Sequence, residues 1–205
     1  MGFLILIMKI AIDIDEVITD TTTALVNYYN RNYNGRRLRF DDFTQYHIED
    51  VLGISKKEGE AIFERFFNSG EFDKIIPIEG AINSIRDLAR ENDISILTAR
   101  PDSYRGKTEN WFDKYLQEFK KRIIYSDDAS SNYRTKAEIC RNMEIGLILE
   151  DHFRYSVECA NAGIDVVLFD KPWNKNIKHK RIKRVKNWNE AVWRIEEFGE
   201  ENEGD

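Results

Sequence analysis

Residues 9–17 have the sequence KIAIDIDEV, an apolar run of strand length that ends in two acidic side chains, Asp13 and Asp15. Four further apolar runs follow along the chain, at residues 94–98, 123–126, 146–150 and 165–169. These runs are short, rich in Ile, Val and Leu, and mostly free of alternation with polar residues. Strands buried on both faces have this composition, which predicts a parallel sheet covered by helices on each side.

Segments with helical periodicity lie between the apolar runs. The apolar side chains of residues 81–89 recur at spacings of three and four, as Ala81, Ile85 and Leu88 do, and residues 111–119 and 139–143 follow the same pattern. This alternation of strands and helices is typical of an α/β fold, and we predict a doubly wound parallel sheet.

Residues 20–79 interrupt that alternation. Residues 21–33 and 56–68 have helical patterns, with a polar stretch containing aromatic residues between them. Nothing in the segment resembles a core strand, and a connection of this length usually has a function. We therefore predict a small helical cap at residues 20–79, inserted after the first strand of an α/β core made of residues 1–19 and 80–205.

Composition excludes several classes of function. The chain has 205 residues, 31 Lys and Arg against 37 Asp and Glu, and a net charge of −6, which does not favour a stable complex with nucleic acid. The apolar run at residues 3–8 is far shorter than the roughly 18 residues that a membrane span needs. Two cysteines are a poor basis for a disulfide framework and fit a reducing cytoplasm. Either Met1 or Met8 is compatible with the start of the natural chain.

Asp13 and Asp15 are the strongest chemical signal. They follow the first predicted strand, at the carboxyl end where open α/β sheets bind ligands, and side chains two residues apart project to the same side of a strand. Such close carboxylates repel each other unless a cation lies between them. With a metal ion, the pair can supply a nucleophile and an acid–base group. The alternative is a pair of surface acids at the end of a strand.

Three weaker signals follow in order. Thr98 ends the second predicted strand, where a hydroxyl and free backbone N–H groups can hold a phosphate oxygen, although it can equally cap a helix. Lys136 precedes the fourth strand and can offset phosphate charge, or lie in solvent. Glu150 and Asp151 end that strand and provide oxygen ligands of the kind that Mg²⁺ prefers.

The joint order of these signals resembles the haloacid dehalogenase-like (HAD) phosphohydrolase superfamily over residues 9–170. Within it, four segments resemble the 5′-nucleotidase (deoxyribonucleotidase) branch: residues 13–20, 98–101, 150–152 and 168–174. The resemblance implies a HAD core with a helical cap and a reaction through a phosphoaspartyl intermediate. Asp13 would be the nucleophile, and Asp15 would protonate the leaving alcohol and then activate water.

The resemblance also implies the ligands of the cofactor and of the substrate phosphate. Mg²⁺ would be held by the Asp13 carboxylate, the Asp15 main-chain carbonyl and Asp151. Glu150 would act indirectly, by orienting these ligands. The phosphate would be bound by Thr98, the Ala99 N–H and Lys136.

Two departures from the family pattern stand out. Glu16 occupies a position that is often Gly in this branch, and its acidic side chain can alter the approach to the leaving group. Lys107 also follows the Thr98 loop and competes with Lys136 for the phosphate role. We favour Lys136 because it lies just before the strand that carries Glu150 and Asp151.

We therefore predict a cytoplasmic, Mg²⁺-dependent phosphomonoesterase that acts on a small phosphorylated substrate, a (deoxy)nucleoside monophosphate. Phe43 and Tyr46 are candidates for stacking on a base, whereas the helical spacing of Phe63, Phe66 and Phe67 favours the core of the cap. A sugar-phosphate phosphatase, a phospho-accepting signalling domain and a catalytically silent binding protein are the alternatives. The oligomeric state is left open.

Overall fold

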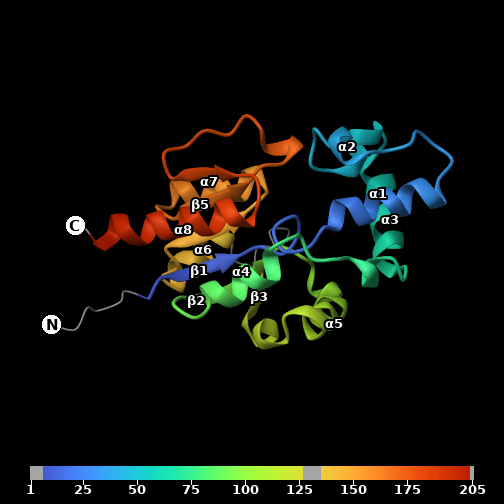
Figure 1. Ribbon diagram of the computed structural model, residues 1–205. Coiled ribbons are helices and arrows are strands. Elements are labelled where there is room, and N and C mark those ends of the chain that lie inside the picture. Colours follow the sequence, from blue (N-terminus) through green and yellow to red (C-terminus); the bar gives the residue numbers. More distant parts are fainter. Residues whose placement is uncertain (1–6, 127–134, 204–205) are drawn as a thin grey trace.

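A six-stranded parallel sheet forms the centre of the molecule (Figure 1), in a computed structural model that describes residues 7–126 and 135–203. The strand order is β3-β2-β1-β4-β5-β6. The strands are β1 (Lys9–Ile12), β2 (Asp93–Thr98), β3 (Ile123–Tyr125), β4 (Leu147–Glu150), β5 (Asp165–Phe169) and β6 (Ile182–Val185). The predicted doubly wound parallel sheet is confirmed. The strands expected at residues 9–13, 94–98, 123–126, 146–150 and 165–169 each lie within one residue of those bounds.

Strand β1 lies between β2 and β4 in the sheet, and both of its faces are buried. Ile10 and Ile12 belong to one hydrophobic cluster, while Ala11, which points to the other face, belongs to a second. Ile10 pairs with residues on both neighbouring strands, Ile94 of β2 and Leu147 of β4. A strand with a core on each side has no polar face, and this explains the uninterrupted apolar run in the sequence.

Helices cover both faces of the sheet. The helices are α1 (Thr21–Asn32), α2 (Ile48–Leu52), α3 (Lys56–Asn68), α4 (Ala81–Leu88), α5 (Arg105–Tyr115), α6 (Lys136–Asn142), α7 (Phe153–Asn161) and α8 (Trp188–Glu203). Side chains of α4, α5 and α8 pack in the cluster of Ile10, and those of α6 and α7 pack in the cluster of Ala11. Short 3-10 turns are Phe40–Asp42, Phe72–Lys74, Asp102–Tyr104, Gln117–Arg122 and η5 (Pro172–Asn174). No helix in the described part of the chain is both long enough and apolar enough to cross a bilayer.

Residues 20–79 add no strand to the sheet, and their helices α1, α2 and α3 lie away from the chain termini (Figure 1). The sequence of the third helix determines where it begins, because the Ser55 hydroxyl accepts a hydrogen bond from the Glu58 N–H while the Glu58 carboxylate accepts one from the Ser55 N–H. Phe66 and Phe67 are buried there, as their spacing predicts. The segment leaves and rejoins the core at one place, where Thr19 forms an isolated bridge with Pro77.

Trp188 anchors the last helix to the loop that follows β1. Its indole N–H donates to the Val17 carbonyl at 2.9 Å, and the side chain is 1% exposed. We expect Trp188→Ala to lower the free energy of unfolding by about 3–5 kcal/mol, because it leaves a cavity and an unpaired carbonyl. Urea unfolding measures this. Trp193→Ala on the same helix is the control, since Trp193 is 51% exposed and its loss should change stability by about 0.5 kcal/mol or less. Equal effects of the two substitutions would contradict the assignment.

Candidate active site

Chemically active side chains converge at the carboxyl ends of three adjacent strands. Asp13 comes directly after β1, Thr98 is the last residue of β2, and Glu150 is the last residue of β4. Asp151 follows Glu150, and all of these side chains are buried. Parallel strands bring their carboxyl ends to one edge, so residues far apart in the sequence lie together here.

Lys136 forms the floor of this cluster. Its Nζ lies 2.7 Å from Asp13 Oδ1 and 2.5 Å from Glu150 Oε1, and the residue is 0% exposed. Thr135 begins helix α6 with a capping box to Glu138, which places Lys136 at the first helical position. Burial acts to lower the pKa of Lys136, but the charges of Asp13 and Glu150 outweigh burial and raise it. The lysine therefore stays cationic.

The competing lysine lies elsewhere. Lys107 Nζ is 3.3 Å from Asp73 Oδ1 and lies over the rings of Phe67 and Phe72. All three of these contacts are with residues of the 20–79 segment. Of the two candidate lysines, the structure brings Lys136 to the acidic cluster.

Asp13, Glu150 and Asp151 each offer an oxygen, and these atoms lie within 4.8 Å of one another. Both Glu150 oxygens are already used, since Oε1 accepts from Lys136 and Oε2 accepts from the backbone N–H groups of Asp151 and His152. Asp151 differs, because its Oδ1 is buried and has no hydrogen-bond partner among the residues that the structure describes. An unpaired buried oxygen is costly unless something else satisfies it.

The electrostatics of the cluster favour a cation. Burial raises the pKa of Asp13 to about 7, with the charges of Glu150 and Asp15 adding to the rise and Lys136 opposing it. Burial, together with the charges of Glu150 and Asp13, raises the pKa of Asp151 well above its ordinary value. Carboxylates crowded in this way are stabilised by a positive ion, and an all-oxygen donor set suits a hard divalent cation such as Mg²⁺. Asp13 and Asp151 are the side chains that would hold it.

The carboxylate of Asp15 lies outside the group of oxygen donors formed by Asp13, Glu150 and Asp151. Arg100 holds it with two hydrogen bonds, Nε to Oδ2 at 2.9 Å and NH2 to Oδ1 at 2.7 Å, and the Thr21 hydroxyl donates to Oδ1 at 2.5 Å. Burial acts to raise the pKa of Asp15, but Arg100 outweighs it and the pKa is lowered. The predicted metal contact of Asp15 is through its main-chain carbonyl and remains a prediction.

Arg100 is a site residue to which the sequence analysis assigned no role. It is 7% exposed and also donates to the Thr108 hydroxyl at 3.1 Å. The signal was present in the sequence, because Arg100 comes two residues after the end of a buried strand. Nothing in the sequence, however, indicates that its partner is Asp15, 85 residues earlier in the chain.

The Thr98 loop lies beside the acids. The Thr98 hydroxyl accepts from the Arg100 N–H at 3.2 Å, and the Thr98 carbonyl accepts from the Ser126 N–H at 2.8 Å. Thr98 therefore stabilises a local turn rather than a helix N-terminus. Ala99 lines a cavity of about 210 Å³ together with Asp13, Asp15, Arg100 and Lys136.

A second cavity, of about 360 Å³, adjoins the first. Asp15, Tyr46, Phe63 and Tyr104 line both cavities, and Phe43 and Trp173 line the larger one. Phe63 packs against the hydrophobic core, as its helical spacing predicts, and this half-buried residue also lines both cavities.

Tyr46 occupies the boundary between the two cavities. Its ring lies 4.1 Å from that of His152 and 5.9 Å from that of Trp173, centroid to centroid. Burial, followed by the charges of the acidic cluster, raises the pKa of Tyr46 well above its usual range, so its hydroxyl keeps its proton.

A larger cavity of about 630 Å³ lies at the opposite, amino end of the sheet beside Asp93, and contains none of the predicted site residues.

Glu16, which stands where this branch often has Gly, has a left-handed backbone conformation and contacts two other segments of the chain. Its backbone φ is +59°, in the left-handed region where Gly is favoured. Its carboxylate accepts from the Thr22 N–H at 2.6 Å and forms an ion pair with Lys171 at 3.1 Å. Glu16 thus satisfies the first turn of α1, which Asp20 does not cap with its side chain, and connects that helix to the loop after β5.

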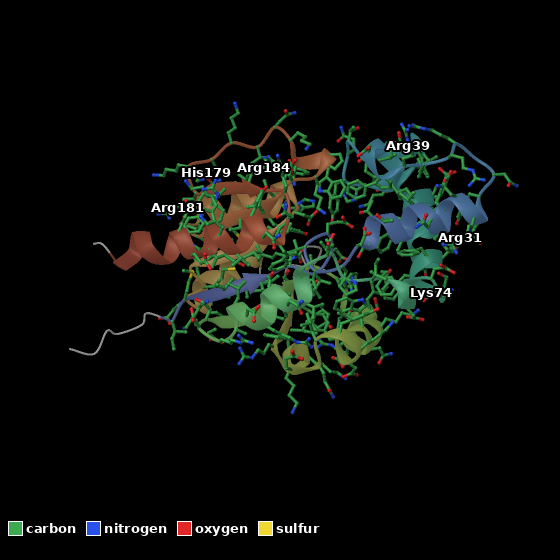
Figure 2. The ribbon with its side chains drawn as sticks, viewed as in Figure 1. Arg31, Arg39, Lys74, His179, Arg181 and Arg184 are labelled. Atoms are coloured by element: carbon green, nitrogen blue, oxygen red, sulfur yellow. The ribbon has the colours of Figure 1, made fainter. Side chains whose placement is uncertain are left out.

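Arg31, Lys74 and Arg181 form ion pairs away from the acidic cluster. Figure 2 shows Arg31, Arg39 and Lys74 at the α1–α3 end of the molecule and Arg181 and Arg184 at the β6 end. Arg31 and Lys74 pair with Glu71, and Arg181 pairs with Asp165. The basic residues of the 171–186 segment lie in the loop before edge strand β6, on that strand and directly after it.

Solved structures of other proteins share this fold. A haloacid dehalogenase-like family hydrolase from Streptococcus pneumoniae has a TM-score of 0.68 at 14% identity and covers 92% of this chain and 98% of that one. A HAD family hydrolase from Deinococcus radiodurans, solved with bound phosphate and sodium, has a TM-score of 0.68 at 14% identity, over 94% of this chain and 96% of that one. The fold is that of the HAD hydrolases.

Residues 7–196 match the family described as "5' nucleotidase, deoxy (Pyrimidine), cytosolic type C protein", and this chain belongs to that family. The putative nucleotidase YqfW from Bacillus subtilis is 31% identical over 189 residues, which make up 90% of this chain and 92% of that protein. A nucleotidase from Clostridium acetobutylicum is 26% identical over 198 residues, 96% of this chain and 97% of that protein. The predicted resemblance is confirmed, and the protein is an enzyme of the phosphatase class.

Proposed function

We propose that this enzyme hydrolyses (deoxy)nucleoside monophosphates in a Mg²⁺-dependent reaction, through a phosphoaspartyl intermediate on Asp13. The observation that carries the proposal is the position of Asp13. One of its oxygens is held by the buried cation of Lys136, and the group lies beside the unpaired oxygen of Asp151 in a cavity of about 210 Å³. A carboxylate fixed in this way is suited to in-line attack on phosphorus.

The reaction takes place in two displacements. The Asp13 carboxylate attacks phosphorus, the bond from phosphorus to the ester oxygen breaks, and Asp15 protonates the departing alcohol. Water then attacks the phosphoaspartate, Asp15 takes its proton, and Asp13 is regenerated with release of phosphate. Mg²⁺ bound by Asp13 and Asp151 would neutralise phosphoryl charge. The Ala99 N–H, the Thr98 hydroxyl and Lys136 would bind the phosphoryl oxygens.

Asp15 requires Arg100 to move before it can act as an acid. In this structure the pair is intact and Asp15 is ionised. Arg100 lines the same cavity as Asp13, so an entering phosphate offers the guanidinium an alternative bidentate partner. We propose that this exchange frees Asp15 to take up a proton.

The substrate class rests on the relatives and on the second cavity. Both relatives are named as nucleotidases, one of them putatively, and the family description names a deoxy, pyrimidine-type 5′-nucleotidase. The cavity of about 360 Å³ beside Asp15 is lined by the aromatic rings of Phe43, Tyr46 and Trp173, which suit a flat base. We also propose that residues 20–79 act as the cap that encloses the substrate.

Phosphate release from a panel of esters tests the reaction and the substrate class. We expect activity on nucleoside monophosphates that EDTA abolishes and added Mg²⁺ restores, because Asp13 and Asp151 need the cation. A preference for hexose phosphates over every nucleotide would support the sugar-phosphate alternative instead. Full turnover in EDTA would contradict the proposed role of the metal.

Tyr46→Ala tests the position of the base. We expect the KM for nucleoside monophosphates to rise by about 5- to 100-fold, equivalent to roughly 1–3 kcal/mol of stacking, while hydrolysis of glycerol phosphate changes little. Tyr46→Phe keeps the ring and is the matched control, with a KM near that of the wild type. A rise in KM of the same size for both esters would place Tyr46 at the phosphate rather than at the base.

A further inference from the structure

A short turn after β5 supports the acidic cluster from behind. The turn η5 carries Trp173 and Asn174, and Trp173 is 9% exposed. The Trp173 indole N–H donates to Asp151 Oδ2 at 3.0 Å, and the Asn174 side-chain N–H donates to the Asp151 main-chain carbonyl at 2.7 Å. Asp151 is therefore held at its side chain and at its backbone by two consecutive residues.

The turn is itself fixed to the edge of the sheet. Asn174 Nδ2 also donates to the Phe169 carbonyl at 2.8 Å, which ties the turn to the end of β5. Arg184 on β6 donates to Asn174 Oδ1 at 2.5 Å and pairs with Asp170 at 2.8 Å. Figure 2 shows Arg184 on the β6 side of the molecule. The indole also packs against two aromatic rings. The centroid of the Trp173 ring lies 5.7 Å from that of Phe40 and 5.9 Å from that of Tyr46.

The two carboxylate oxygens of Asp151 therefore have different environments. Oδ2 accepts from the indole N–H, and Oδ1 is buried with no hydrogen-bond partner in residues 7–126 and 135–203. The neighbouring acids have cationic partners, Lys136 for Asp13 and Glu150, and Arg100 for Asp15. An indole N–H is a neutral donor, so it orients Asp151 without cancelling the charge that a metal ion would need.

We propose that Trp173 is a positioning residue for the metal site, and that its indole N–H fixes the Asp151 carboxylate with Oδ1 directed to a divalent cation. This inference rests on the proposed function, because that function supplies the cation. Residues that orient metal ligands typically change metal affinity by about 10- to 100-fold when they are replaced. The role differs from simple packing, since it depends on one N–H group and not on the volume of the ring.

Trp173→Phe removes the N–H and keeps an aromatic ring. We expect the dissociation constant for Mn²⁺, measured by electron paramagnetic resonance of the free ion with no substrate present, to rise by about 10- to 100-fold. We expect the melting temperature in EDTA to fall, because the buried Asp151 Oδ2 loses its donor, and the gain in melting temperature on adding Mg²⁺ to shrink. Trp193→Phe, on the exposed face of α8, is the matched control and should bind Mn²⁺ as the wild type does.

A measurement on the wild-type chain keeps the test independent of whether the variant folds. Of the four indole N–H resonances, the one that belongs to Trp173 should shift when Mg²⁺ binds, because the carboxylate whose Oδ2 accepts its hydrogen bond then binds the metal through Oδ1. Replacing Trp111, Trp188 and Trp193 by Phe one at a time assigns that resonance by elimination. An unshifted Trp173 resonance, or unchanged Mn²⁺ affinity in Trp173→Phe, overturns the inference. Trp173-dependent metal binding without phosphate release would instead overturn the proposed function alone.

Discussion

Asp13→Asn is expected to lower phosphate release by about 10³-fold or more, because an amide cannot replace the carboxylate that attacks phosphorus. The substitution is nearly isosteric. It removes one ion pair with Lys136 but also removes a like charge from a crowded cluster, so the fold should be kept. The measurement is kcat for a nucleoside monophosphate at saturating Mg²⁺, with circular dichroism to verify folding.

The control for this prediction is Asp113→Asn. Asp113 is on α5 and forms an ion pair at 2.6 Å with Lys120 of the Gln117–Arg122 turn. Neither residue lines the two cavities at the acidic cluster. Asp113→Asn should therefore leave kcat unchanged. Acid-quenched enzyme with labelled substrate should retain phosphate on the wild-type chain and not on the Asp13 variant. Full activity of Asp13→Asn would end the proposed mechanism.

Lys136→Met is expected to have the second largest effect, on stability and on activity together. It would leave Asp13 and Glu150 buried without the cation that lies within 2.7 Å of both. Removing one partner of a buried ion pair costs about 3–5 kcal/mol, since the remaining charge is uncompensated. Urea unfolding in EDTA measures this loss, and Mg²⁺ should restore part of it by neutralising the same carboxylates.

Lys107→Met distinguishes the two candidate lysines. Lys107 is partly exposed and pairs with Asp73 at 3.3 Å, so we expect a change of about 1 kcal/mol or less in stability. Its effect on kcat should be small, whereas Lys136→Met should lower kcat as well as stability. The opposite ranking would transfer the phosphate role to Lys107.

The strands and the helices of residues 20–79 could be located from local sequence because their signals are local. Strand β1 has a core on each side, and its run of buried residues is visible without knowledge of its neighbours. Helix α3 is bounded by a capping box and by the spacing of its aromatic side chains, and the structure has it at the expected Lys56–Asn68. The helical spacing of Phe63 indicates which face of the helix it is on, but it does not reveal that two cavities lie beside that face.

The sequence by itself determined the parallel sheet and the edge at which Asp13, Thr98 and Asp151 meet. Parallel strands require this, because the residue that follows each strand must lie at the same edge. Only the tertiary structure decided which charges pair there. Arg100 reaches Asp15 across 85 residues, Lys171 reaches Glu16 across 155, and Trp173 reaches Asp151 across 22. Such pairings depend on distances in space between loops, and no periodicity along the chain encodes those distances.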